Sequence, residues 1–342
     1  MAGLAPAIHV FILLANIGGR LVLRIVARIT ASLAAAAMLA ACGHFDRDKV
    51  SIGIGTAAYA PQAASPYAWL YLPYARMASL NYDASRNGGC PRAGAMTDTA
   101  AMRRLAALND EWECWRALPD YKDCSNPANC RFGLGFHVWR RRDCGQAVIA
   151  FRGTDRGDRL DWLANLRWIL PGDEPDQYEQ VNRLLRRVVG DIRTRCPLAP
   201  IVAAGHSLGG GLAQFAGYRN RHIAYVYAFD PSPVTAYFDV GERTLERTTQ
   251  KLGIDRIYES GEVLSLPRYL ASGVFPTSQC RPFVRIARFN VIGQRGLIFG
   301  HSIDSLADGL RQAAVPPKPR MLPTGFRQAR DCIIVFTDRG AV

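Results

Sequence analysis

Short apolar runs and longer amphipathic segments alternate along the central part of the chain. Apolar runs occupy Gln146–Phe151, Ala199–Ala204 and Ile223–Phe229, and Gln177–Cys196 carries apolar residues at helical spacing between the first two. Strands buried on both faces of a parallel sheet have continuous apolar runs of this kind. A helix between two such strands provides the crossover that parallel pairing requires. The pattern predicts an α/β fold with a mostly parallel central sheet flanked by helices.

A Gly-x-Ser-x-Gly pentapeptide lies directly after the second apolar run. It reads Gly205-His206-Ser207-Leu208-Gly209, and a helical pattern follows over Gly210–Tyr218. A sharp strand-to-helix turn exposes a serine hydroxyl above the sheet edge and needs small residues on both sides of the serine. We therefore predict Ser207 as a nucleophile, and the alternative is an ordinary glycine-rich turn.

Order along the chain narrows the choice of a general base for Ser207. In strand–turn–helix sites of this type the order is serine, acid, histidine, and only His222 and His301 follow Ser207. His222 closes the predicted helix, where we expect it to face solvent. His301 lies between an apolar run and a helical pattern, at a predicted loop on the sheet edge. We therefore predict His301 as the base.

Two carboxylates lie at predicted strand ends between the serine and the histidine. Asp230 ends the apolar run 223–229, and Glu262 follows the run that begins at Ile257. A carboxylate at this place fixes the imidazole tautomer and stabilises the imidazolium. The acid more often follows the second strand after the serine, which favours Glu262 and leaves Asp230 as the alternative. Either could instead be a loop carboxylate in a surface ion pair.

Several motifs in the same order resemble the class 3 lipase family over roughly residues 74–313. The resemblance rests on Val148-Ile-Ala-Phe-Arg-Gly-Thr154, the GHSLGG run at 205–210, Asp161–Trp168, Phe229–Val234 and Glu259–Pro267. It implies an α/β-hydrolase fold and a serine ester hydrolase, a lipase or phospholipase-like enzyme that works through an acyl-enzyme and needs no cofactor or metal.

The resemblance also implies roles for individual residues. Ser207, His301 and Glu262 would form the catalytic triad, and Thr154 and the backbone N–H of Leu208 would form the oxyanion hole. The family usually has aspartate where this chain has Glu262, which keeps Asp230 as an alternative acid. The segment after the lid-like stretch 161–168 is short, so a long mobile flap is not expected.

The N-terminus has the composition of an export signal. Three arginines precede an apolar stretch, Ile29–Ala41, that is too short to cross a bilayer comfortably. The join Leu39-Ala-Ala-Cys42 resembles the bacterial lipoprotein cleavage box, which implies lipidation of Cys42. We predict a lipoprotein-type signal peptide over 1–41, a linker over 42–73 and a class 3 lipase-like domain over 74–342. An ordinary secretory cleavage site and an uncleaved anchor are the alternatives.

Nine cysteines agree with export to an oxidising compartment. If Cys42 is lipidated, an even number is left for disulfides, whose pairing the sequence does not determine. Several cluster in a predicted cysteine-rich insertion over 109–142 and just beyond it. Zinc is the rival interpretation, but the spacing of Cys124 and Cys130 does not suit it.

The formal net charge is +13, from scattered arginines and four lysines. This favours contact with anionic surfaces, although an arginine-rich genome composition would explain it equally well. We expect a lipid or other ester substrate and a membrane surface as partners, and no nucleic acid. The predicted location is the bacterial cell envelope, and the oligomeric state is not determined. Acyl transfer or amide hydrolysis on the same triad, and a noncatalytic envelope lipoprotein with a retained fold, are the alternative functions.

Overall fold

A computed structural model describes residues 47–54, 59–83, 89–118, 134–153, 177–262, 282–293, 299–315, 336–337 and 340–341. The chain divides into two compact units, Met1–Phe45 and Asp46–Val342. Everything below concerns the second unit. The predicted signal peptide and Cys42 lie outside the described residues.

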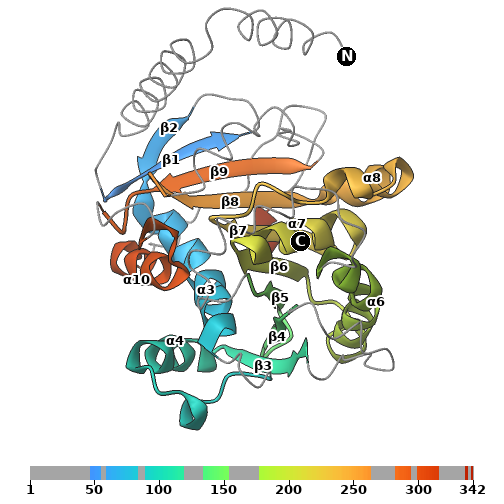
Figure 1. Cartoon of the computed structure of the whole chain (residues 1–342), viewed down its shortest axis with the longest axis horizontal. Coiled ribbons are helices and arrows are strands. Elements are labelled where there is room, and N and C mark those ends of the chain that lie inside the picture. The colour runs from blue at the N-terminus through green and yellow to red at the C-terminus, as the bar shows by residue number, and fades with distance from the viewer. Residues whose placement is uncertain are drawn as a thin grey trace, which may run out of the picture. The chain divides into compact units, whose positions relative to one another are not determined.

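The second unit is built on a mixed sheet to which nine of the described strands belong (Figure 1). The order across it is β2-β1-β9-β8-β7-β6-β5-β4-β3, and β5 to β9 are mutually parallel. The strands β1, β2, β3 and β4 pair antiparallel at the two edges. The bounds are β1 Lys49–Ile54, β2 Ala60–Ala63, β3 Trp112–Ala117, β4 Phe136–Arg141, β5 Ala147–Phe151, β6 Ile201–His206, β7 Ile223–Phe229, β8 Gly253–Glu259 and β9 Phe283–Phe289, and a separate pair is β10 Phe336–Thr337 with β11 Gly340–Ala341.

Helices cover both faces of the sheet, as Figure 1 shows. One core contains side chains of α3, α4 and α10, and the other contains side chains of α6 and α7. Along β6, Val202 and Ala204 face the first core, and Ile201 and Ala203 face the second. This alternation explains why a strand buried on both faces has a continuous apolar run. The helices are α3 Ala64–Asp83, α4 Thr99–Asn109, α6 Gln177–Arg195, α7 Leu208–Arg219, α8 Glu242–Thr248 and α10 Ile303–Ala313, with 3₁₀ turns η1 Ala93–Ala95, η6 Tyr237–Asp239, η7 Thr249–Lys251 and η8 Phe299–His301.

The predicted mostly parallel α/β-hydrolase fold is confirmed. The strand β6, the helix α7 and the strand β7 follow one another as the apolar pattern indicated, and α6 forms the crossover from β5 to β6.

The predicted linker over 42–73 needs correction, because β1, β2 and the first half of α3 fall within it. The strand β1 pairs with β9 and buries Val50 and Ile52. Its six residues carry only a short alternation of buried and less buried positions, and a strand this short gives a weak sequence signal.

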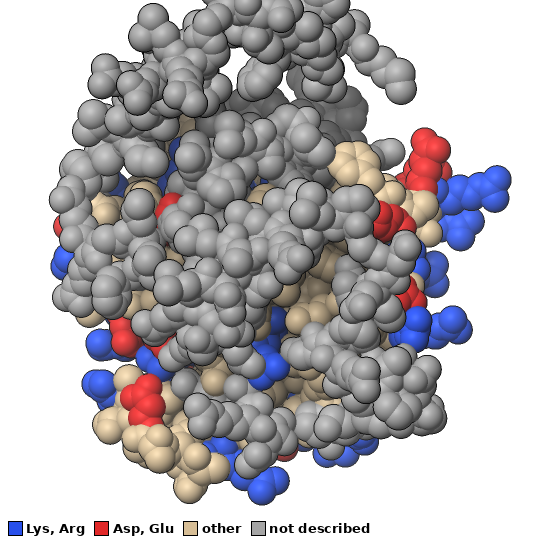
Figure 2. All heavy atoms as spheres, viewed as in Figure 1, with Lys and Arg blue, Asp and Glu red and all other residues tan. Residues whose placement is uncertain are grey.

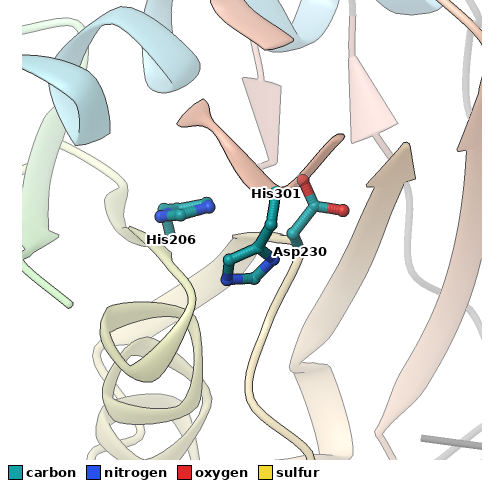
Figure 3. A group of neighbouring side chains, drawn as sticks. All are labelled: His206, Asp230 and His301. Atoms are coloured by element: carbon teal, nitrogen blue, oxygen red, sulfur yellow. The ribbon is translucent and has the colours of Figure 1, made fainter. Parts of the chain in front are cut away.

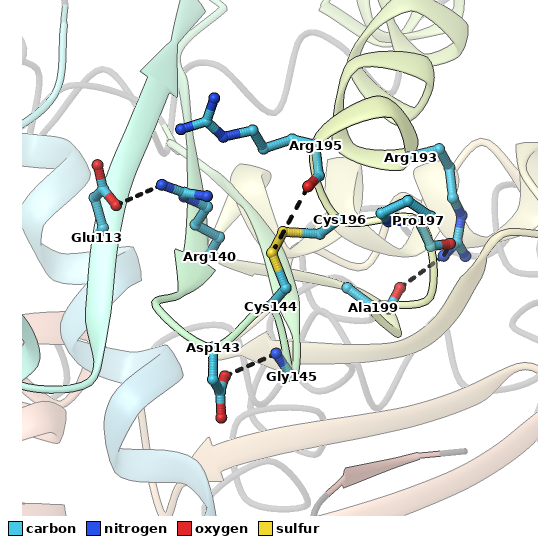
Figure 4. Close-up of a disulfide and its surroundings, with 10 residues drawn as sticks. All are labelled: Glu113, Arg140, Asp143, Cys144, Gly145, Arg193, Arg195, Cys196, Pro197 and Ala199. Atoms are coloured by element: carbon cyan, nitrogen blue, oxygen red, sulfur yellow. Dashed lines mark hydrogen bonds and ion pairs between the residues drawn. A yellow bond between two sulfur atoms is a disulfide. The ribbon is translucent and has the colours of Figure 1, made fainter.

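Two disulfides join described residues. Cys90 bonds to Cys114 in β3, and Cys144, in the turn between β4 and β5, bonds to Cys196 at the end of α6. Figure 4 shows the second bridge, close to the ion pair between Arg140 and Glu113. The cysteine-rich stretch therefore supplies two sheet strands, and its second bridge ties the β4–β5 hairpin to the helix that precedes β6.

Charged side chains lie at separate places on the face seen in Figure 2, with Asp and Glu among the Lys and Arg. This arrangement agrees with the scattered arginines of the sequence. Within the described part of the chain, no helix combines the length and the apolar character that a membrane crossing needs.

Candidate active site

Ser207 occupies the turn between β6 and α7 in a conformation that L-residues rarely adopt. Its φ is 56° and its ψ is −125°. Its backbone N–H donates to the carbonyl of Phe229 at 3.0 Å, and its carbonyl accepts from Ser232 N–H at 2.9 Å. Because non-glycine residues hold such a conformation only when their surroundings fix it, the strain is typical of a functional position. This is the geometry expected of a serine at a strand-to-helix elbow.

Two positions before and two positions after Ser207, the elbow has room only for glycine. A Cβ atom at Gly205 would lie 2.2 Å from the carbonyl oxygen of Gly209, and one at Gly209 would lie 2.5 Å from the carbonyl oxygen of Phe151. A Cβ at Gly153 would lie 2.6 Å from the carbonyl oxygen of His206 and 3.3 Å from Ser207 Cβ. The loop after β5 therefore contacts the turn that carries Ser207.

His301 and Glu262 meet at the same edge of the sheet. Glu262 follows β8, and its Oε2 lies 2.8 Å from Nδ1 of His301, which ends η8. The Glu262 side chain is fully buried, and that of His301 is 12% exposed. A bond from Nδ1 to a carboxylate sets the tautomer in which Nε2 can accept a proton.

Asp230, the alternative acid, makes a different contact. It follows β7 with a φ of 38°, is completely buried, and accepts the backbone N–H of Glu259 through Oδ1 at 2.9 Å. An oxygen of Asp230 also lies close to ring nitrogens of His206 and His301. Nδ1 of His301 lies within hydrogen-bond distance of Glu262.

His206 is buried inside the elbow. Its Nδ1 lies 3.0 Å from the hydroxyl of Tyr82, near the end of α3. Its ring centre lies 4.8 Å from that of His301, so the two imidazoles are in contact. Tyr82 carries no motif signal, and the contact spans 124 positions of sequence, so the sequence did not indicate it.

Glu259, at the end of β8, is a buried carboxyl whose burial no motif indicates. Its two oxygens accept the backbone N–H groups of Val291 and Ile292 at 3.1 and 2.9 Å, which ties β8 to the segment after β9. The pKa of Glu259 is raised to about 8, chiefly by burial and also by the neighbouring carboxyl of Asp230, against the lowering effect of backbone hydrogen bonds from Ile292, Val291 and Gly293.

The remaining predicted site residues lie at the helix start, in an exposed turn or outside the described residues. Leu208 is the first residue of α7, so its backbone N–H belongs to the helix N-terminus beside Ser207. His222 lies exposed in the turn between α7 and β7, away from the sheet edge, as expected. Thr154, the lid-like segment 161–168 and Cys42 lie outside the described residues.

Comparison with known proteins points to phospholipases. The family described as "Phospholipase-like: Tle-like phospholipase domain" matches residues 73–229. The extracellular phospholipase A1 of Serratia liquefaciens is 33% identical over 126 residues, which are 36% of this chain and 32% of that protein. The chain is similar to phospholipases. The matching segment spans about a third of the relative's length, and the family match includes Ser207 but ends before Glu262 and His301.

Two fungal lipases are among the similar solved structures. Lipase II from Rhizopus niveus matches with a TM-score of 0.41 and 17% identity, covering 65% of this chain and 80% of the lipase. The Rhizomucor miehei lipase propeptide complex matches with a TM-score of 0.43 and 16% identity, covering 75% of this chain and 80% of the other.

Proposed function

We propose that this protein is a serine carboxylic ester hydrolase that acts on lipid esters as a lipase or phospholipase-like enzyme. The observation that carries the proposal is the 2.8 Å contact between His301 Nδ1 and Glu262 at the sheet edge where Ser207 turns into α7. The similarity to a Tle-like phospholipase domain and to a phospholipase A1 supports lipid esters as the substrate class.

The proposed reaction has two stages. The Oγ of Ser207 attacks the ester carbonyl carbon while Nε2 of His301 takes the hydroxyl proton. The bond from that carbon to the alkoxy oxygen then breaks, and the alcohol leaves with the proton. Water then attacks the acyl carbon and gives a proton to His301. The bond from that carbon to Oγ breaks, His301 returns the proton to Oγ, and the carboxylic acid and the free serine are released. Glu262 holds the imidazole in position and stabilises its charged form.

The developing oxyanion needs donors that are in place before the reaction. In the proposal, the backbone N–H of Leu208 at the start of α7 is one donor and Thr154 is the other. Gly153, the residue before Thr154, lies against Ser207, which supports this assignment. No cofactor enters any step.

Hydrolysis of a chain-length series of p-nitrophenyl esters, and of phospholipid vesicles, tests the proposal. We expect Ser207→Ala to lower kcat by several orders of magnitude with the fold intact. Ser65→Ala is the matched control, because the Ser65 side chain bonds to the backbone of Val315 at the surface. Wild-type turnover in Ser207→Ala would contradict the proposal.

The products of the same assay distinguish the alternatives. Release of free acid supports hydrolysis, whereas transfer of the acyl group to an added alcohol supports an acyltransferase. Turnover of amides but not esters supports an amidase. A folded wild-type protein that converts none of these substrates supports a noncatalytic envelope lipoprotein.

We further propose that the protein is exported and anchored through a lipid on Cys42. Growth with a labelled fatty acid tests this, and we expect label on the wild-type protein and none on Cys42→Ser. Release of Cys42→Ser from the membrane fraction is the second expected result. An unlabelled wild-type protein would contradict the anchor and leave the hydrolase proposal unaffected.

A further inference from the structure

Three metal-ligating side chains converge beside the candidate active site. His206 comes from the end of β6, Asp230 from the residue after β7 and His301 from η8, as Figure 3 shows. One ring nitrogen of each histidine and one carboxylate oxygen of Asp230 all lie within 4.8 Å of one another. His206 and Asp230 are 5% and 0% exposed, and the side chain of His301 is 12% exposed, so the group is largely buried.

Each of the three side chains is also held from outside the group. The Tyr82 hydroxyl lies 3.0 Å from Nδ1 of His206, and Glu262 bonds to Nδ1 of His301. The backbone N–H of Glu259 donates to Oδ1 of Asp230. Metal ligands in proteins are usually oriented by such outer hydrogen bonds, above all a carboxylate on the second nitrogen of a ligating histidine.

We propose that His206, Asp230 and His301 form a binding site for a zinc ion that inhibits the enzyme. Two imidazoles and one carboxylate are a ligand set that zinc accepts, with a fourth position left for water or Ser207. Calcium and magnesium prefer oxygen ligands throughout, so this set does not suit them.

The spacing of the ligand atoms is compatible with this assignment. Zinc bonds to nitrogen and oxygen at roughly 2.0–2.2 Å, which places tetrahedral ligand atoms roughly 3.3 Å apart. The widest separation here is at most 4.8 Å. With both Nδ1 atoms engaged by Tyr82 and Glu262, zinc takes Nε2 of each ring.

Zinc at this position stops the proposed reaction. The lone pair of His301 Nε2 that accepts the Ser207 proton is taken by the metal. This inhibitory consequence rests on the proposed function, whereas zinc binding itself does not. Removal of zinc restores the base, so the inhibition is reversible.

Competition with a fluorescent zinc chelator tests binding, with mature protein freed of any histidine tag. We expect the wild type and Ser207→Ala to bind one zinc ion alike. We expect His206→Asn and Asp230→Asn to weaken zinc binding by at least about tenfold, while His222→Asn, an exposed histidine outside the group, leaves it unchanged. Circular dichroism checks that each variant is folded. Because there are two ligand variants, the test can still be made if one of them misfolds.

Hydrolysis of a soluble short-chain ester in zinc-buffered solution tests inhibition. We expect zinc to inhibit the wild type and EDTA to restore its rate. The half-inhibiting concentration in His206→Asn, measured against that variant's own metal-free rate, rises by at least about tenfold. The proposed site would be refuted if the wild type did not bind zinc. It would also be refuted if His206→Asn and Asp230→Asn both bound zinc as tightly as the wild type. Binding without inhibition of an active enzyme would overturn the inhibitory role. Zinc binding by a protein that hydrolyses no ester would refute the proposed function and leave the site standing.

Discussion

Nδ1 of His301 lies 2.8 Å from Oε2 of the fully buried Glu262. The two residues are 39 positions apart and come from different loops at one sheet edge. The contact fixes which imidazole nitrogen faces the reacting groups, and most of the site chemistry proposed above depends on it.

Glu262→Gln tests that dependence. A glutamine retains the size of the side chain but removes the charge that stabilises the imidazolium, so we expect kcat to fall by about 10³- to 10⁴-fold. Asp230→Asn is the comparison variant, because Asp230 is the alternative acid and accepts the backbone N–H of Glu259. Steady-state kinetics should show a much smaller fall in the comparison variant. A larger fall in Asp230→Asn would assign the acid to Asp230 instead.

Gly205→Ala tests the close approach in the elbow. The new Cβ would meet backbone atoms of Gly209, which cannot move without displacing Ser207, so we expect a loss of about 1–3 kcal/mol in unfolding free energy together with lost activity. Gly190→Ala in α6 is the control, since no atom lies within 4 Å of its added Cβ. That change should leave activity intact and raise stability by about 0.5–1 kcal/mol. Equal stability of the two variants in urea unfolding would refute the account of the elbow.

Removal of the Cys144–Cys196 bridge should destabilise the domain. The double variant to serine is expected to lose about 2–5 kcal/mol, because the bridge closes a loop with a sequence separation of 52. The Cys90–Cys114 bridge has a separation of 24, so its removal should cost about 0.7 kcal/mol less in chain entropy. Denaturant unfolding under oxidising conditions measures both. Unchanged stability of either double variant would show that its bridge does not form.

Glu259 should make stability fall with rising pH. Its pKa is about 8 in the folded protein against an ordinary value of 4.5, so between these values the folded state holds a proton that the unfolded state has lost. The unfolding free energy therefore decreases from about pH 5 to pH 8, at a slope approaching 1.4 kcal/mol per pH unit from this group, and levels off above. Glu259→Gln should have a shallower slope over that window in urea unfolding. An identical slope in the variant would show that Glu259 does not titrate there.

The site residues could be predicted from the sequence where their residue type and their order along the chain both indicate the same role. Ser207 has a local signature, because the glycines at 205 and 209 are needed by the turn itself. His301 follows from serine–acid–histidine order, and Glu262 was favoured over Asp230 by its place after the second strand beyond the serine; the structure joins the two by a hydrogen bond. Their catalytic roles remain predictions.

The other features of the site and of the fold depend on contacts between residues far apart in the sequence, which no local sequence pattern indicates. Tyr82 reaches His206 across 124 positions, and Glu259 reads as an ordinary strand-end carboxylate although it is 1% exposed. The strand β1 gives little signal because its six residues show only a short alternation of buried and less buried positions. Burial of a polar side chain and pairing of a short strand are both decided by tertiary packing.

Labelling with a fluorophosphonate serine probe, followed by peptide mapping, tests the central claim most directly. Such a probe reacts with an activated serine and not with ordinary hydroxyls. The account predicts one labelled peptide, which contains Ser207, and no labelling of Ser207→Ala. A folded wild-type protein that takes up no label, or label at a serine other than Ser207, would contradict it.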